Sequence, residues 1–259
     1  MKTYFLPHYL QPYKTLIDQT TKESVKLRFK DTAPELTESK IGGTPYTENY
    51  SSLAKDNEGH PMQLLVQLNC KELHLPYPFP QDGLIQIFVN QQFGNIHTSK
   101  TADQFHVKFI ATIEQIEDED SLLGHHFNPS KYFPIQKTYA LQGEMMLDPV
   151  SSLDYRYNDY FTFEKLCLIT EDERTFEEIY FETYLGAEHK VGGYPYFIEN
   201  DFRVGKAQLQ QYDTLLLQLV SDDEHYINYR DSGIVSFFIN SEKLKDLDFT
   251  DIYMHIEDY

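Results

Sequence analysis

The sequence predicts a strand-rich α+β fold built from two similar halves with pseudo-two-fold symmetry and a few peripheral helices. Three short blocks occur twice, in the same order and at nearly the same spacing. Residues 40–46 (KIGGTPY) recur as 190–196 (KVGGYPY), residues 64–68 (LLVQL) as 215–219 (LLLQL), and residues 83–90 (GLIQIFVN) as 233–240 (GIVSFFIN). Such a series indicates an internal duplication. The chain also has 20 Tyr and 18 Phe, and aromatic residues favour strands.

The repeats predict the domain organisation. We expect one domain, residues 1–259, made of two repeats at about residues 23–113 and about residues 171–259, with an intervening connection. No segment rich in Pro, Gly or Ser separates the copies, so we expect the two halves to share one sheet system or one continuous core.

Most of the expected strands lie in or beside the repeated blocks. Residues 25–30 alternate apolar and charged side chains, as a half-buried strand does. The repeated apolar runs predict strands that are buried on both faces. Further strands are expected at residues 106–113, 135–146 and 251–257.

Helices are expected mainly between the two repeats. The best candidates are residues 158–169 and residues 171–185. In the second, Phe176, Ile179, Tyr180 and Tyr184 recur at helical spacing. A short or irregular helical segment is expected before residue 22, and another short helix at residues 241–247.

A glycine pair before a proline opens each repeat. Glycine reaches positive φ at little steric cost, and the residue before proline is held extended, so each pair predicts a sharp turn that feeds an extended segment. The alternative is a backbone nest for an anion, but the helix and Lys-Ser/Thr ending of a phosphate loop are missing. The residues of this motif are Gly42, Gly43 and Pro45 in the first copy and Gly192, Gly193 and Pro195 in the second.

A glutamine lies inside one apolar strand of each copy, Gln67 in the first and Gln218 in the second. A buried amide needs hydrogen-bond partners, so we expect each glutamine to bind the backbone around its own glycine turn. Gly83 and Gly233 come directly before the next strand of each copy and are expected to form its turn.

The net charge is −19 and it is uneven. Residues 1–150 carry 13 Lys and Arg against 18 Asp and Glu, whereas residues 151–259 carry 9 against 23. An acidic surface repels phosphate backbones, so nucleic acid is not an expected partner, but it attracts a basic protein. The alternative is that the acidic side chains keep an aromatic-rich chain in solution.

Other patterns limit the expected location and chemistry. Two cysteines in 259 residues favour a cytoplasmic location, and no apolar run is long enough to span a membrane or to serve as a signal peptide. The chain contains no G-x-S-x-G, no G-x-G-x-x-G after a strand and no H-E-x-x-H. We therefore expect no cofactor and name no catalytic residue.

The repeated blocks resemble the YwqG-like family, a bacterial domain family of unknown function. The resemblance runs from about Ser39 to the C-terminus. The matching residues of the second copy are His189, Gly192, Gly193, Pro195, Asp201, Arg203, Leu216, Leu217, Gln218, Ser221, Asp222, Asp231 and Gly233. The sequence departs from the family pattern at Glu199 (family Gln), Phe202 (Pro), Tyr229 (Trp) and Arg230 (Gly). The resemblance implies a duplicated strand-rich fold without an established activity, and relatives near toxin–immunity systems suggest a binding role.

Asp201, Arg203, Asp222 and Asp231 form the candidate ligand or partner site. If the strands that carry Gln218 and follow Gly233 pair, Asp222 and Asp231 approach each other, where carboxylates could hold a hard cation. Aspartates are common in surface turns, and Arg203 with Asp201 or Asp222 is also explained as a structural ion pair, so no metal site is predicted. The adjacent residues His125 and His126 lack a metal-binding pattern.

Two hypotheses of function follow. The first is a non-enzymatic cytoplasmic binding protein whose acidic surface takes a basic protein, in an immunity-like role. The alternative is an enzyme or small-molecule binder with its site in the cleft between the two repeats, because seams between halves often bind ligands. A deep cleft lined by Arg203, Asp222 and Asp231 would favour the alternative, and a shallow seam filled by aromatic side chains the first. The sequence leaves the oligomeric state open.

Overall fold

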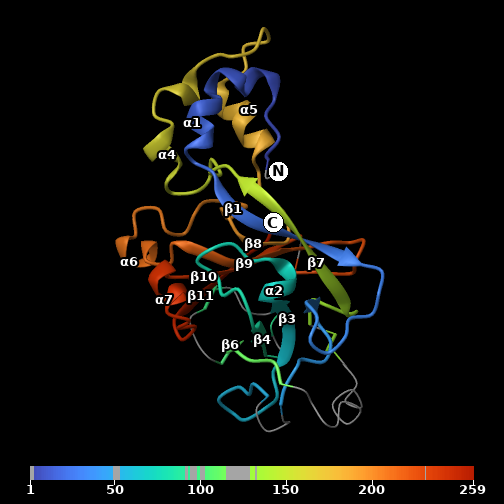
Figure 1. The fold of residues 1–259 in the computed structure, drawn as a ribbon. Coiled ribbons are helices and arrows are strands. Elements are labelled where there is room, and N and C mark those ends of the chain that lie inside the picture. The colour runs from blue at the N-terminus through green and yellow to red at the C-terminus, as the bar shows by residue number, and fades with distance from the viewer. Residues whose placement is uncertain are drawn as a thin grey trace.

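The computed structural model describes residues 3–48, 53–90, 93, 98–99, 103–114, 129–131, 133–230 and 232–259 (Figure 1). The strands are β1 (Lys22–Lys30), β2 (Lys40–Ile41), β3 (Gln63–Asn69), β4 (Leu84–Val89), β5 (Thr98–Ser99), β6 (Phe105–Ile110), β7 (Tyr139–Asp148), β8 (Lys190–Gly192), β9 (Thr214–Val220), β10 (Ile234–Ile239) and β11 (Ile252–Glu257). The helices are η1 (His8–Tyr13), α1 (Lys14–Asp18), α2 (Cys70–Leu73), α4 (Tyr157–Tyr160), η4 (Glu164–Leu166), α5 (Phe176–Thr183), α6 (Ala207–Gln210) and α7 (Ser241–Lys245).

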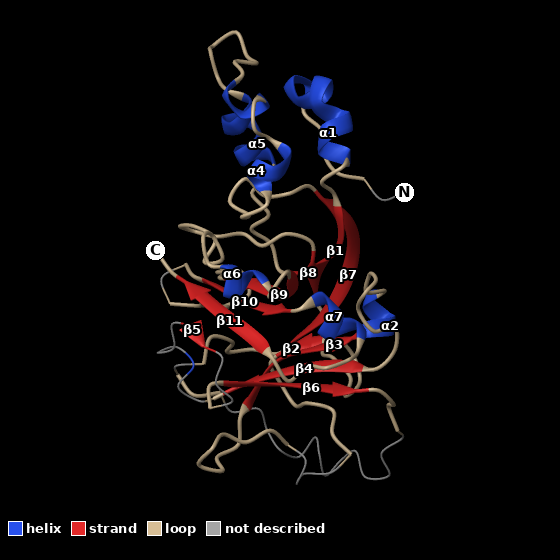
Figure 2. Ribbon diagram, turned by 90° about the vertical axis from the view of Figure 1, so that its left-hand side faces the viewer, coloured by secondary structure: helices blue, strands red, loops and turns tan. Residues whose placement is uncertain are grey.

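All strands join one antiparallel sheet in the order β5-β11-β10-β9-β8-β1-β7-β2-β3-β4-β6. Without the two-residue strand β5, the remaining ten strands form a nearly closed barrel (Figure 2). The fold is therefore strand-rich α+β, as predicted.

The long strands β1 and β7 form the middle of this order. They pair along their whole length, from Lys22 opposite Asp148 to Lys30 opposite Ala140. On one side of this pair lie β2, β3 and β4, which carry the first set of repeated residues, and on the other side lie β8, β9 and β10, which carry the second. The sheet thus has the same succession of repeated segments on either side of β1 and β7.

The two largest hydrophobic cores lie in the barrel and at one end of the molecule. The larger core fills the barrel, where β4 and β10 are buried at every position and β3 and β9 at all positions but their ends. The second core lies among η1, α1, α4 and α5, which form one end of the molecule in Figure 1. We call this end, residues 4–18 and 157–184, the cap.

Both glycine turns have the backbone that the sequence predicts. The φ angles are +67° and +80° at Gly42 and Gly43, and +74° and +70° at Gly192 and Gly193. These values lie in the left-handed region that glycine adopts easily. A Cβ at Gly193 would also collide with the Asp148 carboxylate, so packing excludes a larger residue there.

Each buried glutamine holds both sides of its turn, as expected. Gln67 Oε1 accepts from the Tyr46 N–H (2.9 Å), and its Nε2 donates to the Leu36 and Glu38 carbonyls (both 2.9 Å). Gln218 does the same with the Tyr196 N–H (2.7 Å) and the Gly186 and Glu188 carbonyls (both 2.9 Å). The amide thus satisfies three backbone groups at each turn.

The lysines that open the repeated blocks are buried in different ways. Lys40 Nζ donates to three backbone carbonyls, those of Glu35, Leu36 and Thr44 (2.7–3.2 Å), and burial lowers the pKa of this ammonium to about 8. Lys190 Nζ instead pairs with the Asp148 carboxylate (2.7 Å). The two turns have the same glutamine–backbone hydrogen bonds, but the first lysine donates to carbonyls and the second is paired with a carboxylate.

The expected helix at residues 158–169 is wrong as a continuous element. Only α4 and the single turn η4 form there, with an extended Cys167 after η4. The second expected helix begins at Phe176 rather than at residue 171. Thr175 and Glu178 form a capping box at that point, and Glu173 has a φ of +62°, which a helix does not allow.

The two glycines before the partner strands have different roles. Gly83 has a φ of +90°, as a turn requires. Gly233 does not lie in the left-handed region; a Cβ there would collide with the Tyr229 and Glu257 carbonyl oxygens. Turn chemistry therefore explains Gly83, and close backbone packing explains Gly233. Residues 117–120, His125, His126 and Asp231 lie outside the described residues.

Candidate functional site

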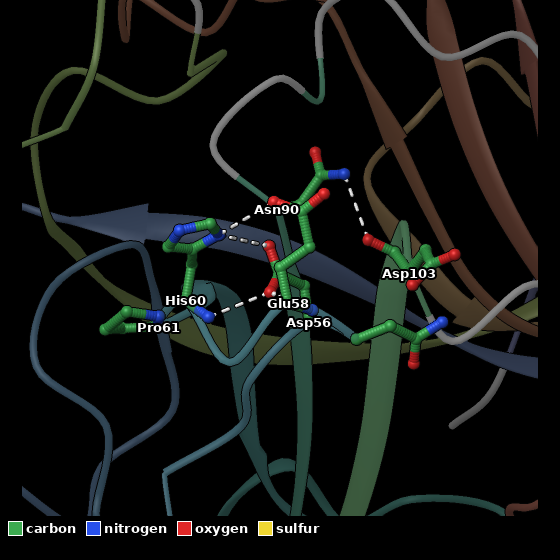
Figure 3. Close-up of a pocket in the computed structure, with 7 residues that line it drawn as sticks. Asp56, Glu58, His60, Pro61, Asn90 and Asp103 are labelled. Atoms are coloured by element: carbon green, nitrogen blue, oxygen red, sulfur yellow. Dashed lines mark hydrogen bonds and ion pairs between the residues drawn. The ribbon is translucent and has the colours of Figure 1, made fainter.

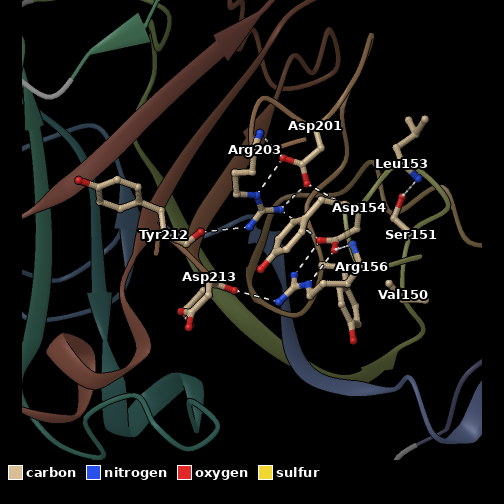
Figure 4. Close-up of polar contacts among 12 residues, drawn as sticks. Val150, Ser151, Leu153, Asp154, Arg156, Asp201, Arg203, Tyr212 and Asp213 are labelled. Atoms are coloured by element: carbon tan, nitrogen blue, oxygen red, sulfur yellow. Dashed lines mark hydrogen bonds and ion pairs between the residues drawn. The ribbon is translucent and has the colours of Figure 1, made fainter. Parts of the chain in front are cut away.

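A buried ionic network joins the cap to the barrel (Figure 4). Arg203 has no exposed surface, and its guanidinium binds both Asp201 oxygens (2.8 and 2.7 Å) and Asp154 Oδ2 (3.1 Å). Its Nη1 donates to the Tyr212 carbonyl just before β9 (3.0 Å). Arg203 and Asp201 are thus a structural pair, and each charge is compensated inside the protein.

The network extends from Asp154 to Arg156 at the start of α4. Arg156 binds both Asp154 oxygens (2.7 Å each) and donates to the Asp213 carbonyl (3.1 Å). Burial alone would raise the pKa of Asp154, but hydrogen bonds and charge from Arg156 and Arg203 outweigh it and lower that pKa. Because Asp154 touches both arginines, it connects the first residues of the cap to the loop before β9.

The structure separates Asp222 from this network. The Asp222 Oδ2 atom lies 2.8 Å from His225 Nδ1 and 3.6 Å from His189 Nε2. Burial lowers the pKa of His189 to about 4, so this imidazole is neutral at pH 7. These contacts thus place Asp201 with Arg203, and Asp222 with two histidines. Asp231 lies outside the described residues, so the joint site of these four residues stays a prediction.

Three large apolar side chains of the cap are exposed on the segment between α4 and α5. Phe163 is 83% exposed, Leu166 71% and Leu168 63%. We call these three residues the apolar patch. Phe161 and Phe176, which flank the segment in sequence, are both fully buried in the cap core.

Hydrogen bonds fix the backbone beneath the apolar patch. The Phe176 N–H donates to the Cys167 carbonyl (2.8 Å), and the Ile169 N–H donates to the Arg174 carbonyl (2.9 Å). Leu168 forms an isolated β-bridge with Thr175. The exposed side chains therefore project from a turn whose backbone is held by hydrogen bonds.

The chain matches the model of a domain of unknown function, DUF1963, over residues 39–257. The chain belongs to the DUF1963 family. No curated protein matches the chain significantly.

The DUF1963 match includes both glycine turns, the ionic network and the apolar patch, and it ends in the last residue of β11. It leaves out η1, α1 and β1, although β1 is one of the two central strands. Among the described residues of this DUF1963 protein, no helix is both long and apolar enough to cross a membrane.

Carboxylates surround the apolar patch in the sequence of the DUF1963 domain. Residues 157–185 contain eight acidic and two basic side chains. The acidic ones are Asp159, Glu164, Glu171, Asp172, Glu173, Glu177, Glu178 and Glu182. Lys165 donates to the Asn158 side chain, and Arg174 pairs with Glu182, so the two cations leave most of the carboxylates uncompensated.

Sequence reasoning missed the apolar patch because it placed these residues on a helix. Phe161, Phe163 and Leu166 fit no single buried face, and Phe163 and Leu166 stay exposed. A useful signal was present: three large apolar side chains lie within a segment rich in acidic residues.

A hollow of about 560 Å³ lies beside the loop before β3 (Figure 3). Asp56, Glu58, His60, Asn90 and Asp103 line it. The Asp56 Oδ1 atom accepts from the Glu58 and His60 N–H groups (3.0 and 2.8 Å), so this carboxylate holds its own turn. Within the described ranges, no group of three His, Cys, Asp or Glu side chains is arranged to hold a metal ion.

Proposed function

We propose that this DUF1963 protein is a non-enzymatic binding protein whose acidic cap takes a basic partner protein. An immunity-like role toward a basic toxin or effector is one form of this proposal. The observation that carries it is the apolar patch, Phe163, Leu166 and Leu168, exposed on a hydrogen-bonded turn within a segment rich in acidic residues.

The physical argument concerns what such a surface does in water. Large apolar side chains that gather in one place favour burial against a partner. Each could contribute about 1.5–3 kcal/mol if fully covered. The carboxylates add selectivity and faster association, because they attract positive partners and repel negative ones.

The alternative, an enzyme or small-molecule binder in the cleft between the repeats, has less support. A groove of about 510 Å³ lies between β6 and the segment that leads into β11, the last strands of the two halves. Phe105, Phe109, Phe249 and Ile252 contribute to its walls, whereas Arg203 is buried in the ionic network and does not line it. An aromatic seam fits the binding hypothesis better than a polar catalytic site.

We also propose that the chain contains an internal duplication. We infer one domain of two repeats, about residues 23–113 and about residues 171–259, with β7 in the connection between them, and a relationship to the YwqG-like family. The support is the recurrence of the hydrogen bonds of Gln67 at Gln218 and the matching sheet neighbours. A cytoplasmic location is also proposed, with which the free thiols of Cys70 and Cys167 are compatible.

Affinity capture from a lysate of the source organism tests the proposal. The wild-type protein is compared with Glu164→Lys/Glu173→Lys/Glu177→Lys, which reverses charge around the apolar patch. The control, Asp223→Lys/Glu224→Lys, makes the same kind of change at exposed barrel residues. We expect the wild type and the control to capture a basic protein at low salt. The cap variant should not capture it.

Salt provides the second arm of this experiment. Raising the ionic strength to about 0.5 M should release the captured protein, because screening weakens attraction between surface charges. Capture that the cap variant retains, or capture of acidic proteins only, would contradict the proposed function.

A further inference from the structure

The groove between β6 and β11 lies where the two ends of the sheet approach without pairing. Among the described strands, β6 ends the sheet on one side, with β4 as its one neighbour. At the other end, the described residues of β5 pair with β11 at Met254 and His255. The groove of about 510 Å³ runs along β6 and faces Leu247, Phe249 and Ile252.

The backbone of β6 turns a row of hydrogen-bonding groups toward this groove. The Asn90 N–H donates to the Gln104 carbonyl (3.1 Å), and Phe105 lies opposite Val89 in the same register. In an antiparallel pair, successive residues direct their N–H and C=O groups alternately toward and away from the partner strand. The groups of Phe105, Val107 and Phe109 therefore point away from β4, along an edge that no described strand covers.

The walls of the groove are apolar. Phe109 stacks on Phe249 with ring centroids 5.4 Å apart, and Phe105 meets Phe237 edge to face at 5.5 Å. Leu247 is partly exposed beside them. An added strand would therefore find backbone partners on β6 and apolar contacts for every second side chain.

The charges at the groove indicate which strand would fit. His106 and Lys108 alternate with the inward-facing residues of β6 and so lie on the outer face. Asp248 and Asp251 on the opposite side share one cation, Lys243 (3.7 and 3.4 Å), so this side of the groove does not add positive charge. The positive charge of Lys108 favours acidic side chains on the outer face of an added strand.

A second copy of the chain is a poor occupant. Antiparallel pairing of two β6 strands about Val107 would place His106 of each copy opposite Lys108 of the other. A positive side chain gains nothing there from a neutral or positive histidine. The charges thus favour a different chain with carboxylates at these positions.

We propose that the groove between β6 and β11 binds an extended peptide as an added strand, with apolar side chains turned into the barrel and acidic side chains turned out beside Lys108. This binding surface is separate from the acidic cap. The peptide would extend the sheet by one strand, paired with the edge of β6 that no described strand covers.

Fluorescence anisotropy with a labelled peptide of alternating glutamate and valine tests this proposal on the full chain. We expect binding at least ~10-fold tighter than that of the matching lysine and valine peptide. Methylation of every second backbone amide should weaken binding by roughly 10-fold, because it removes donors along one edge of the strand.

Two variants assign the binding to β6. Val107→Pro removes an outward N–H without touching the ladder to β4 and should weaken binding by about 10-fold. Lys108→Glu changes a surface side chain, keeps the backbone, and should reverse the preference toward the lysine peptide. Phe163→Ser on the cap is the matched control and should bind normally.

Three results would overturn the proposal. The first is no binding of the glutamate peptide up to roughly 1 mM. The second is equal binding of the methylated and unmethylated peptides, which would indicate apolar adhesion only. The third is a wild-type dimer in sedimentation equilibrium that Val107→Pro dissociates, which would make the second copy the occupant.

Discussion

The barrel and the cap differ in where they place polar and apolar side chains. In the barrel, buried polar groups such as Gln67 and Gln218 have partners at hydrogen-bond distance. In the cap, large apolar side chains such as Phe163 lie in water on an ordered turn. Under the proposed function, this difference separates two roles: the buried barrel residues stabilise the fold, and the exposed cap residues are proposed to bind a partner.

The ionic network at the junction should give the largest effect on stability. Arg203→Met leaves Asp154 and Asp201 buried with one cation fewer, so we expect a loss of about 4 kcal/mol in the free energy of unfolding. Urea denaturation measures it. Arg28→Met is the control, since Arg28 pairs with Glu144 on the surface and should cost less than about 1 kcal/mol. Similar losses for the two variants would remove the distinction between a buried network and a surface pair.

Acid should destabilise the barrel through His189. The folded pKa is about 4 and the ordinary value is 6.5, so between these values only the unfolded chain binds this proton. Stability is therefore highest above pH 6.5 and falls toward pH 4, by up to roughly 3 kcal/mol from this group. His189→Gln should show a shallower loss in urea denaturation across that range. Identical pH slopes would show that His189 does not titrate in this way.

The glutamines at the two glycine turns should have the next largest effect on stability. Gln218→Leu leaves three buried backbone groups without a partner, and we expect a loss of about 2 kcal/mol. Gln67→Leu should cost at least as much, because Gln67 Oε1 also accepts from Gln86 (2.8 Å). Gln142→Leu, on the exposed face of β7, is the control. Unchanged thermal stability of the Gln218 variant would contradict the role of the amide.

The apolar patch should give the smallest effect on stability. Phe163→Ser/Leu166→Ser/Leu168→Ser changes exposed side chains only, so the free energy of unfolding should move by less than about 0.5 kcal/mol per residue. Substitutions in the apolar patch would then cost far less stability than substitutions of buried groups in the barrel. A loss above roughly 3 kcal/mol for the triple variant would place these residues in the cap core instead.

Much of the barrel could be predicted from the sequence because its signals are local. Apolar runs gave strands β3, β4, β9 and β10, and glycine pairs gave turns with positive φ. The departure at Arg230 also carried information: where the resembled family has glycine, Arg230 has a φ of +58°. The order of the strands was not predictable, because β1 pairs with β7 across more than a hundred residues.

The candidate site was predictable only in part. Asp201 and Arg203 do lie together, but their partner is Asp154, and no local pattern in the sequence connects those segments. Asp222 contacts two histidines, His189 and His225, because β8 brings His189 beside the end of β9. The apolar patch was not predicted because residues 158–169 were expected to form one helix, whereas only the short helices α4 and η4 form there.

Site-specific photo-crosslinking tests the central claim most directly. A photoreactive amino acid is placed at Leu166 in the cap or at Tyr226 on the barrel, positions with similar exposure (71% and 66%). After mixing with lysate at low salt, we predict that a basic protein is cross-linked from position 166 and not from position 226. Cross-linking of the same protein from position 226 alone would contradict the assignment of binding to the cap.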